Sequence, residues 1–241
     1  GPGVPQPDAG PGLTQAPHPG VSPARAARVG REAPAGASSW LDMSVTRDSL
    51  GLGLGVALSG ADAPPVPAGL TDSKALTPRR RDALIEPIQS WVQDCAVGYA
   101  SPQEIDRWGI IVALRLAGRR ALAEVASRGL VPGGVLLDGS HDWLSEPDDL
   151  FGGIDGPEDP FGVALPVRMQ VKADLSCAVV AAASVLAKVA RDRLMTETED
   201  PGYGWASNKG YGSAAHARAI AELGVSVFHR RSWKMPTKPT K

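Results

Sequence analysis

Two aspartates lie where short apolar strands are predicted to end. Asp138 directly follows the apolar run 135–137, and Asp174 ends a Lys-Ala-Asp tripeptide between a short strand and a long helix. Sites in open α/β sheets gather at strand ends, although an aspartate there can equally be a turn or cap residue. Paired carboxylates without a histidine or cysteine cluster suit Mg²⁺ or Mn²⁺, and such ions support phosphoryl-transfer chemistry.

A second polar segment, Thr71-Asp72-Ser73-Lys74, precedes a predicted helix that begins with Thr77 as N-cap and Pro78 at the first helical position. A hydroxyl, a lysine and free backbone N–H groups at a helix N-terminus can bind a phosphate. The same residues can equally form a plain capping loop, so the segment by itself leaves both interpretations open.

A third segment, Asn208-Lys209-Gly210-Tyr211, places a cation beside an aromatic ring on a glycine-containing loop. Such a ring can stack on a sugar or base while the lysine contacts a phosphate, or it can simply pack on the core. The four histidines show no metal-ligand spacing, and His229 is interpreted as a structural or phosphate-side residue.

The stretch 172–192 must position Asp174. After the tripeptide it is rich in alanine, which predicts a helix that packs very close to a sheet. Val179, Leu186 and Leu194 recur at helical spacing and predict a buried stripe. The charged residues near the end of this helix, Lys188, Arg191, Asp192 and Arg193, are expected to mark its return to solvent.

The remaining elements alternate between strands and helices, which favours an α/β fold with a mixed sheet. A Leu-Gly alternation predicts a strand at 50–58. Ser101 and Glu104 form a predicted capping box for a helix that continues to about Ser127. Further elements are predicted at 78–92 (helix), 95–99, 135–137 and 167–171 (strands), and 214–223 (helix).

The composition divides the 241 residues into three parts. Residues 1–39 are rich in Pro, Gly and Ala and predict a disordered tail; 40–235 form the expected domain, and 236–241 a short basic tail. A long acidic loop, 140–166, interrupts the domain, and the chain after Tyr203 is mostly basic, which is compatible with a polyanionic partner. Two unpaired cysteines and the lack of a long apolar run predict a cytoplasmic protein away from membranes. We also expect it to be a monomer.

From about Gly69 to Trp233 the chain resembles ribonuclease HII, and it is similar to the actinobacterial type of that family in its His141-Asp142-Trp143-Leu144 segment. No single matching piece is specific, but their order along the chain is. The pieces are Gly69-Leu70-Thr71-Asp72-Ser73-Lys74, Ser101-Pro102-Gln103-Glu104-Ile105-Asp106, Val135-Leu136-Leu137-Asp138-Gly139, Lys172-Ala173-Asp174, Ala181-Ala182-Ala183-Ser184-Val185-Leu186-Ala187-Lys188 with Arg191-Asp192, Lys209-Gly210-Tyr211, and His229-Arg230-Arg231-Ser232.

The resemblance implies an RNase H-like fold, a mixed sheet with helices on both faces and a helical C-terminal part. It implies an endonuclease that cleaves RNA in RNA–DNA hybrids or nicks duplex DNA 5′ to an embedded ribonucleotide, using Mg²⁺ or Mn²⁺. Four acids hold the metals in the family, and two of them correspond to Asp138 and Asp174. Tyr211 corresponds to the tyrosine that stacks on the ribose, and Ser73 and Lys74 to phosphate contacts; the expected hybrid-binding surface also includes Lys209, Arg230 and Arg231.

The chain departs from the family at the first strand, which should carry Asp-Glu-Val-Gly-Arg-Gly. One alignment uses Val29-Gly30-Arg31 and puts Ala27-Arg28 in place of the two acids. The other keeps the family's spacing to Asp72 and puts Met43-Ser44 there. In that case Asp42 is one residue out of register, on the other face of a strand, and Asp48 stands in place of the second glycine.

Three hypotheses follow from these residues. The first is an active ribonuclease HII. The second is a relative that keeps the hybrid-binding surface but does not cleave, because the first two metal-ligand acids are absent. The third is an α/β scaffold whose motifs are incidental.

Overall fold

A computed structural model of the protein describes residues 40–48, 51–58, 64–146 and 156–232, and for the first two of these ranges it describes the backbone. These residues lie within one compact unit, Pro34–Lys241. The predicted tails at 1–39 and 236–241, the alternative first-strand segment Val29-Gly30-Arg31 and the middle of the acidic loop fall outside the described residues. In the described part of the chain, no helix has both the length and the apolarity needed to cross a membrane.

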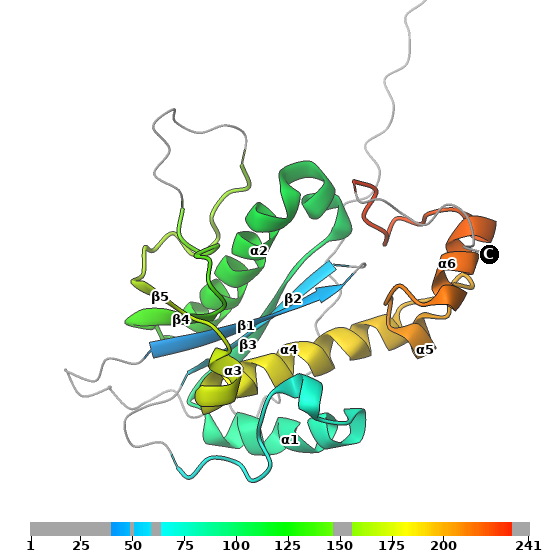
Figure 1. The fold of residues 1–241 in the computed structure, drawn as a ribbon. Helices are drawn as coiled ribbons and strands as arrows, with labels where there is room; N and C mark the ends of the chain where they lie inside the picture. Colours follow the sequence, from blue (N-terminus) through cyan, green and yellow to red (C-terminus); the bar gives the residue numbers. More distant parts are fainter. Residues whose placement is uncertain (1–39, 49–50, 59–63, 147–155, 233–241) are drawn as a thin grey trace, which may run out of the picture. The chain divides into compact units, whose positions relative to one another are not determined.

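A five-stranded mixed sheet forms the centre of the fold (Figure 1). Its order is β3-β2-β1-β4-β5; β1–β2 and β2–β3 are antiparallel, whereas β1–β4 and β4–β5 are parallel. The α/β class and the mixed sheet are therefore confirmed. The strands are β1 (Trp40–Asp48), β2 (Gly51–Leu58), β3 (Asp94–Ala100), β4 (Gly134–Asp138) and β5 (Val167–Gln170).

The first two α-helices begin at the residues that local capping rules predict. Thr77 accepts a hydrogen bond from the Arg80 N–H and caps α1 (Pro78–Trp91), which starts with proline. Ser101 and Glu104 form both bonds of the predicted capping box at the start of α2 (Pro102–Ser127). Gly109 interrupts α2 with a φ of 81°, a left-handed conformation that glycine adopts without steric cost.

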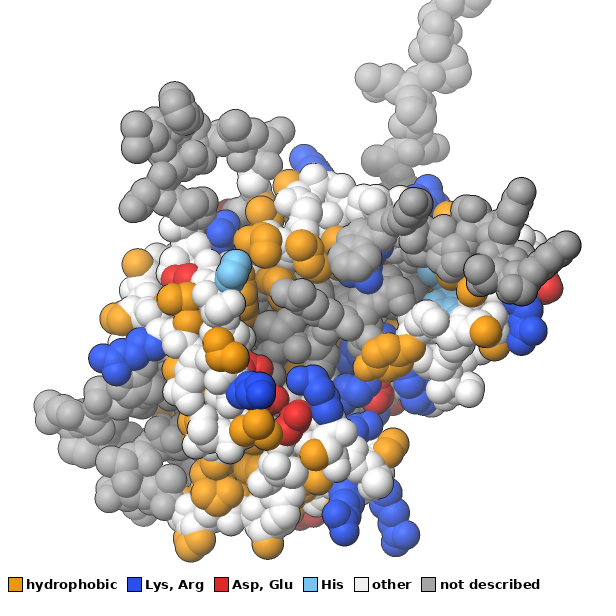
Figure 2. Space-filling view, in the orientation of Figure 1, with side chains coloured by type: hydrophobic (Ala, Val, Ile, Leu, Met, Phe, Trp, Pro, Cys, Tyr) orange, Lys and Arg blue, Asp and Glu red, His pale blue; other side chains and the backbone are white. Residues whose placement is uncertain are grey.

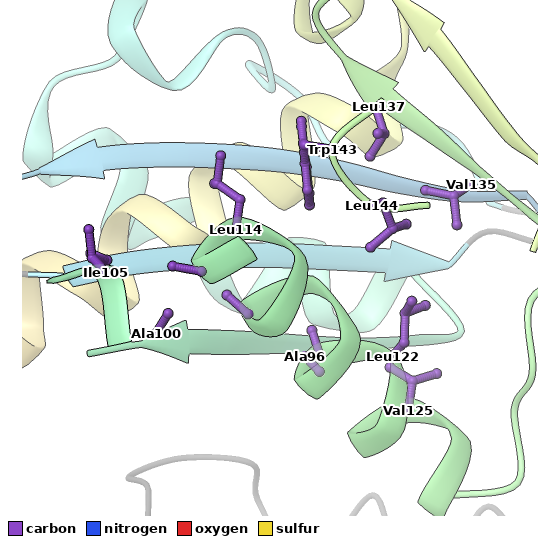
Figure 3. Close-up of a cluster of buried hydrophobic side chains, with 13 residues drawn as sticks. Ala96, Ala100, Ile105, Leu114, Leu122, Val125, Val135, Leu137, Trp143 and Leu144 are labelled. Carbon is purple, nitrogen blue, oxygen red and sulfur yellow. The ribbon is translucent and has the colours of Figure 1, made fainter. Parts of the chain in front are cut away.

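The helices cover both faces of the sheet, with α2 on one face and α4 with α1 on the other (Figure 1). Strand β3 shows the division, because Ala96 and Ala100 belong to the core under α2 while Cys95 belongs to the core under α1 and α4. Gly98 allows α2 to approach β3 closely, since a Cβ there would lie 2.0 Å from the Ala117 carbonyl oxygen. Trp143 and Leu144, which follow β4, complete the core under α2 (Figure 3).

The predicted helix after Asp174 is divided in two. A single turn, α3 (Ala173–Ser176), carries Asp174, and α4 (Ala178–Glu197) starts after an extended Cys177. Every residue from Val179 to Ala187 on α4 is buried, so the small side chains do place this helix close against the sheet, as predicted.

Two predictions about the end of α4 are wrong. Leu194 is exposed and Met195 is buried instead, because the last turns pack against the C-terminal cluster of Tyr203, Trp205 and Ile220 rather than against the sheet. Arg191 is buried and does not mark a return to solvent.

The C-terminal part is helical, as the family resemblance implies. It contains α5 (Trp205–Asn208), a single turn within the predicted loop, and α6 (Ala214–Leu223), which ends at Gly224 as predicted. His229 is buried and lies 4.7 Å from the Tyr203 ring, between centroids. Its interpretation as a structural residue is thus consistent with its position.

Candidate active site

The end of β4 brings Asp138 to α3. Strand β4 lies between β1 and β5 in the sheet, and its apolar residues before Asp138 are mostly buried. The half-buried Asp138 is its last residue. The Asp138 Oδ1 atom accepts a hydrogen bond from the Ala173 N–H at 2.9 Å. This bond fixes the carboxylate and ties the end of the strand to the first residue of α3.

Asp174 lies one residue further along α3, with 7% of its surface exposed. Burial raises the pKa of its carboxyl above the ordinary value, and the negative charges of Asp138 and Asp72 raise it further. Lys74 acts in the opposite direction, with its Nζ 3.8 Å from Asp174 Oδ2. The structure therefore brings together the two aspartates that the sequence selects, and their negative charge is only partly compensated by an exposed lysine.

Asp72, Ser73 and Lys74 lie at a single 3₁₀ turn, Ser73–Ala75. Asp72 caps this turn through its Oδ1, which accepts from the Lys74 N–H at 2.9 Å. The buried Ser73 hydroxyl lies 2.7 Å from the Ser184 hydroxyl of α4, and Arg81 of α1 donates to the Ser73 carbonyl oxygen at 2.9 Å. Ser73 therefore holds the turn against α4, while the Lys74 side chain projects into solvent.

We name Asp138, Asp174, Asp72 and Lys74 the carboxylate end of the site. Its oxygen donors suit a hard divalent cation, and bringing two carboxylates together would be favoured by such an ion. Asp138 and Asp174, the two proposed ligands among them, nevertheless supply only part of the oxygen ligand set of these ions. Among the side chains of 64–146 and 156–232, no three histidine, cysteine or acidic groups converge into a metal-holding cluster.

The backbone register shows which first-strand residues lie next to Asp138. Strands β1 and β4 are parallel, and Met43 of β1 is opposite Leu137 of β4. Ser44 therefore follows Met43 at the level where Asp138 follows Leu137. Asp42 is opposite Leu136, further from the strand end. This register favours the alignment that puts Met43-Ser44 in place of the family's Asp-Glu pair.

Tyr211 lies at the far end of α4 and is 44% exposed. Its hydroxyl is 2.7 Å from Lys188 Nζ, and the Lys188 and Arg191 cations lie 4.6 and 4.9 Å from the ring centroid. Its carbonyl oxygen is 3.0 Å from His216 Nδ1. The ring is thus held from several sides while nearly half of its surface remains open. We name Tyr211, Lys188, Arg191 and Asp192 the Tyr211 end of the site.

The other residues predicted for nucleic-acid binding differ in their surroundings. Lys209 adopts a left-handed conformation with φ 52°, and its Nζ donates to Thr196 Oγ1 and the Ala206 carbonyl oxygen at 2.5 and 2.6 Å. Arg231 is exposed, and its backbone N–H donates to Asp106 Oδ2 at 2.7 Å. Arg230 is buried, a position that does not suit a residue in direct contact with a polyanion.

Several residues at the site were not selected from the sequence. Asp72 approaches Asp174 from a segment about a hundred positions earlier, and no local pattern reveals that contact. Lys188 and Asp192 form an i,i+4 ion pair, with Nζ 2.6 Å from Oδ1. Their helical spacing was a readable signal, but it gave no indication that Tyr211 lies above them.

The described part of the acidic loop is attached to α2 rather than to the site. Arg119 of α2 donates to the Val163 carbonyl oxygen at 2.6 Å, and its NH1 lies 3.5 Å from Asp159 Oδ2. The space-filling view shows basic side chains gathered where α1, α3 and α4 meet, with acidic side chains among them (Figure 2). The mixed charge of that region contrasts with the acidic loop.

Known proteins resemble this chain over most of its length. The family model described as Ribonuclease HII matches residues 66–236, which begin after β2. Ribonuclease HII of Streptomyces avermitilis is 45% identical over 179 residues, 73% of this chain and 67% of that protein. Ribonuclease HII of Cereibacter sphaeroides is 43% identical over 171 residues, 70% of this chain and 71% of that protein. The predicted likeness to actinobacterial members is therefore confirmed.

Solved structures show the same fold. The ribonuclease H2 of Pyrococcus horikoshii OT3 is similar with a TM-score of 0.61 at 22% identity, covering 82% of this chain and 95% of that one. The ribonuclease HII in the PCNA:RNase HII complex of Archaeoglobus fulgidus has a TM-score of 0.53 at 25% identity, covering 81% and 94%. The fold is RNase H-like, and because the family model matches most of the sequence, the chain belongs to the ribonuclease HII family of endoribonucleases.

Proposed function

We propose that the protein hydrolyses the RNA strand of RNA–DNA hybrids, or nicks duplex DNA 5′ to an embedded ribonucleotide, leaving 3′-hydroxyl and 5′-phosphate ends. The observation that carries this proposal is the meeting of Asp138 and Asp174 beside Lys74, from three separate elements. Family membership supplies the reaction class, and the carboxylates supply the place where it would occur.

Each end of the site has a separate role in this proposal. Asp138 and Asp174 would hold Mg²⁺ or Mn²⁺, and the ion would supply Lewis-acid activation and charge compensation during phosphodiester hydrolysis. Lys74, exposed beside them, would contact a backbone phosphate, and Ser73 would keep its turn fixed against Ser184. The open face of Tyr211 would stack on the ribose of the substrate.

A second candidate function is binding of hybrids without cleavage. The register of β1 supports binding without cleavage. Met43 and Ser44 lie where β1 passes the end of β4, and neither of them is an acid like the family's metal ligands. With the first two acids missing, metal affinity would fall, whereas Lys74 and Tyr211 would still contact a duplex.

Cleavage of one defined substrate separates the two functions. The purified protein is incubated with a duplex that contains a single ribonucleotide, in Mg²⁺, in Mn²⁺ and in EDTA. We expect a nick at the ribonucleotide with Mg²⁺ or Mn²⁺ but not with EDTA. We expect Asp138→Asn to abolish this nick. Glu124→Gln, which removes an exposed carboxylate on α2 that pairs with Arg128, is the matched control and should retain the nick.

The same samples give the contrary outcomes. Binding of the duplex by fluorescence anisotropy, with no nick in any divalent metal, would establish the binding function instead. A nick that persists in EDTA or in Asp138→Asn would show that another group or a contaminant is responsible.

A further inference from the structure

Asp192 contacts several charged side chains at once, and the proposed function gives this carboxylate no role. Its Oδ1 accepts from Lys188 Nζ at 2.6 Å and from Arg191 NH1 at 3.2 Å. Its Oδ2 lies 3.9 Å from NH2 of Arg81, which belongs to α1. One carboxylate therefore lies among three cations on two helices, and without it these cations would repel one another.

On one side, Asp192 is linked to the turn that carries Lys74. Arg81 donates from NH1 to the carbonyl oxygens of Ser73 and Leu76, at 2.9 and 2.6 Å. These two carbonyls bracket the 3₁₀ turn, so the orientation of Arg81 and that of the turn depend on each other. The ion pair with Asp192 holds the other end of the same guanidinium.

On the other side, Asp192 is linked to Tyr211. Lys188 Nζ makes two contacts, one to Asp192 Oδ1 and one to the Tyr211 hydroxyl at 2.7 Å. The lysine also lies against the Tyr211 ring, which it approaches as a cation on a π face. Lys188 therefore links the Asp192 carboxylate to the Tyr211 ring.

Burial distinguishes this cluster from an ordinary surface ion pair. The side chains of Lys188 and Asp192 are 15% and 19% exposed. The Asp82–Arg193 pair joins α1 to α4, as the Arg81–Asp192 contact does, but its side chains are 55% and 56% exposed. Exposed pairs contribute little because water screens them, whereas partly buried pairs fix their geometry more strongly. Asp82 therefore provides a control of the same type on the same two helices.

From these contacts we infer that Asp192 is a positioning residue that holds Lys188 against Tyr211 and Arg81 against the Ser73 turn, so that the two ends of the substrate surface keep a fixed relation. The inference rests on the proposed function for its effect on catalysis. Its structural part, the placement of Lys188 and Tyr211, stands on the contacts alone.

The test compares Asp192→Asn with Asp82→Asn. We expect Asp192→Asn to lower kcat/KM for the single-ribonucleotide duplex about tenfold, the size of one lost charge-assisted hydrogen bond. Asp82→Asn should leave kcat/KM unchanged. In a Tyr211→Phe background, which already lacks the hydroxyl, Asp192→Asn should lower kcat/KM by a clearly smaller factor than in the wild type, because the link through Lys188 is already broken and only the link through Arg81 remains.

A purely structural role for Asp192 would give a different pattern. Asp192→Asn would then lower the melting temperature, and it would reduce kcat/KM by the same factor in the wild type and in Tyr211→Phe. That additivity would overturn the inference. If Asp192→Asn is too unstable to assay, Lys188→Met breaks the link from the cationic side. It should lower kcat/KM and should be non-additive with Tyr211→Phe, because both changes break the link through Lys188. An additive loss would again overturn the inference.

A readout that needs no activity separates failure of this inference from failure of the proposed function. The protein has three tyrosines, so ¹³C-tyrosine labelling resolves the Tyr211 ring by NMR. Its resonance should shift in Asp192→Asn and not in Asp82→Asn. If the wild type neither binds nor nicks the duplex but the resonance shifts, the proposed function is wrong and the positioning role stands; if the wild type nicks and the resonance does not move, the positioning role is wrong.

Discussion

The carboxylate end and the Tyr211 end of the site are held by different kinds of contact. At the carboxylate end, Asp138 and Asp174 are placed by the ends of backbone elements, and the link between them runs through the Ala173 N–H. At the Tyr211 end, Lys188 and Asp192 place the ring through side chains that extend from one helix.

The electrostatic balance of the two ends differs in the same way. Asp174 is buried near like charges, and its pKa is raised, whereas Tyr211 lies on cations that already have an acidic partner in Asp192. The carboxylate end is thus destabilised in the absence of a cation, and the Tyr211 end is complete without a ligand. The difference fits the proposed function, in which the first end holds the metal and the second end places the substrate.

The largest expected effect comes from Asp174→Asn. Nicking should fall by at least about 100-fold, because even residues that only support metal ligands typically change activity 10–100-fold. Since the folded state raises the Asp174 pKa, the ionised form opposes folding, and this cost appears as the pH rises through the folded pKa. Asp174→Asn should therefore raise the melting temperature at pH 7 in EDTA; a lower melting temperature would contradict the electrostatic description of this end.

The next effect concerns the support of Tyr211 by histidines. A carbonyl oxygen can only accept, so His216 Nδ1 donates to the Tyr211 carbonyl oxygen. His216 Nε2 then carries no proton and accepts from His229 Nε2, 3.1 Å away. The His229 Nδ1 atom in turn accepts from the Ser226 N–H. This arrangement requires both rings to be neutral.

Burial, followed by the neighbouring His216, lowers the pKa of His229 from 6.5 to about 4. A depressed histidine pKa contributes stability above the unfolded pKa, and that contribution is lost as the pH falls from about 6.5 towards 4. The loss should reach at most about 3 kcal/mol, measured by guanidinium unfolding at pH 7, 5.5 and 4.5. His229→Phe should flatten this dependence; an unchanged profile would show that other groups cause it.

The smallest of the three effects tests the ring itself. Tyr211→Ala should weaken binding of the single-ribonucleotide duplex by about 1–3 kcal/mol, the value of one lost stacking contact, while leaving the melting temperature nearly unchanged because the ring is half exposed. Anisotropy in EDTA measures this without cleavage. An equal weakening for an all-DNA duplex would show that Tyr211 does not distinguish the ribonucleotide.

Much of the framework could be predicted because it depends on neighbours in the chain. The cap at Thr77, the capping box of Ser101 and Glu104 and the end of α6 at Gly224 each depend on hydrogen bonds within a few residues. Asp138 and Asp174 were selected because sites in open α/β sheets gather at strand ends, although that rule left a turn or cap role equally open.

Errors arose where distant contacts override local periodicity. Leu194 fits the helical stripe, yet Met195 is buried because the C-terminal cluster lies on that side of α4. The break at Cys177 separates α3 from α4, although the alanine-rich sequence is compatible with one helix.

The sequence by itself determined the α/β class, the family and the two aspartates, since these depend on local pattern and on motifs in order. Only the tertiary structure decided that Asp72 lies near Asp174, and that Asp192 links Arg81 to Lys188 and Tyr211. The physical reason is that charges interact through space: residues about a hundred positions apart come within a few ångströms of each other once α4 is packed against the sheet and α1, and no local pattern specifies that meeting.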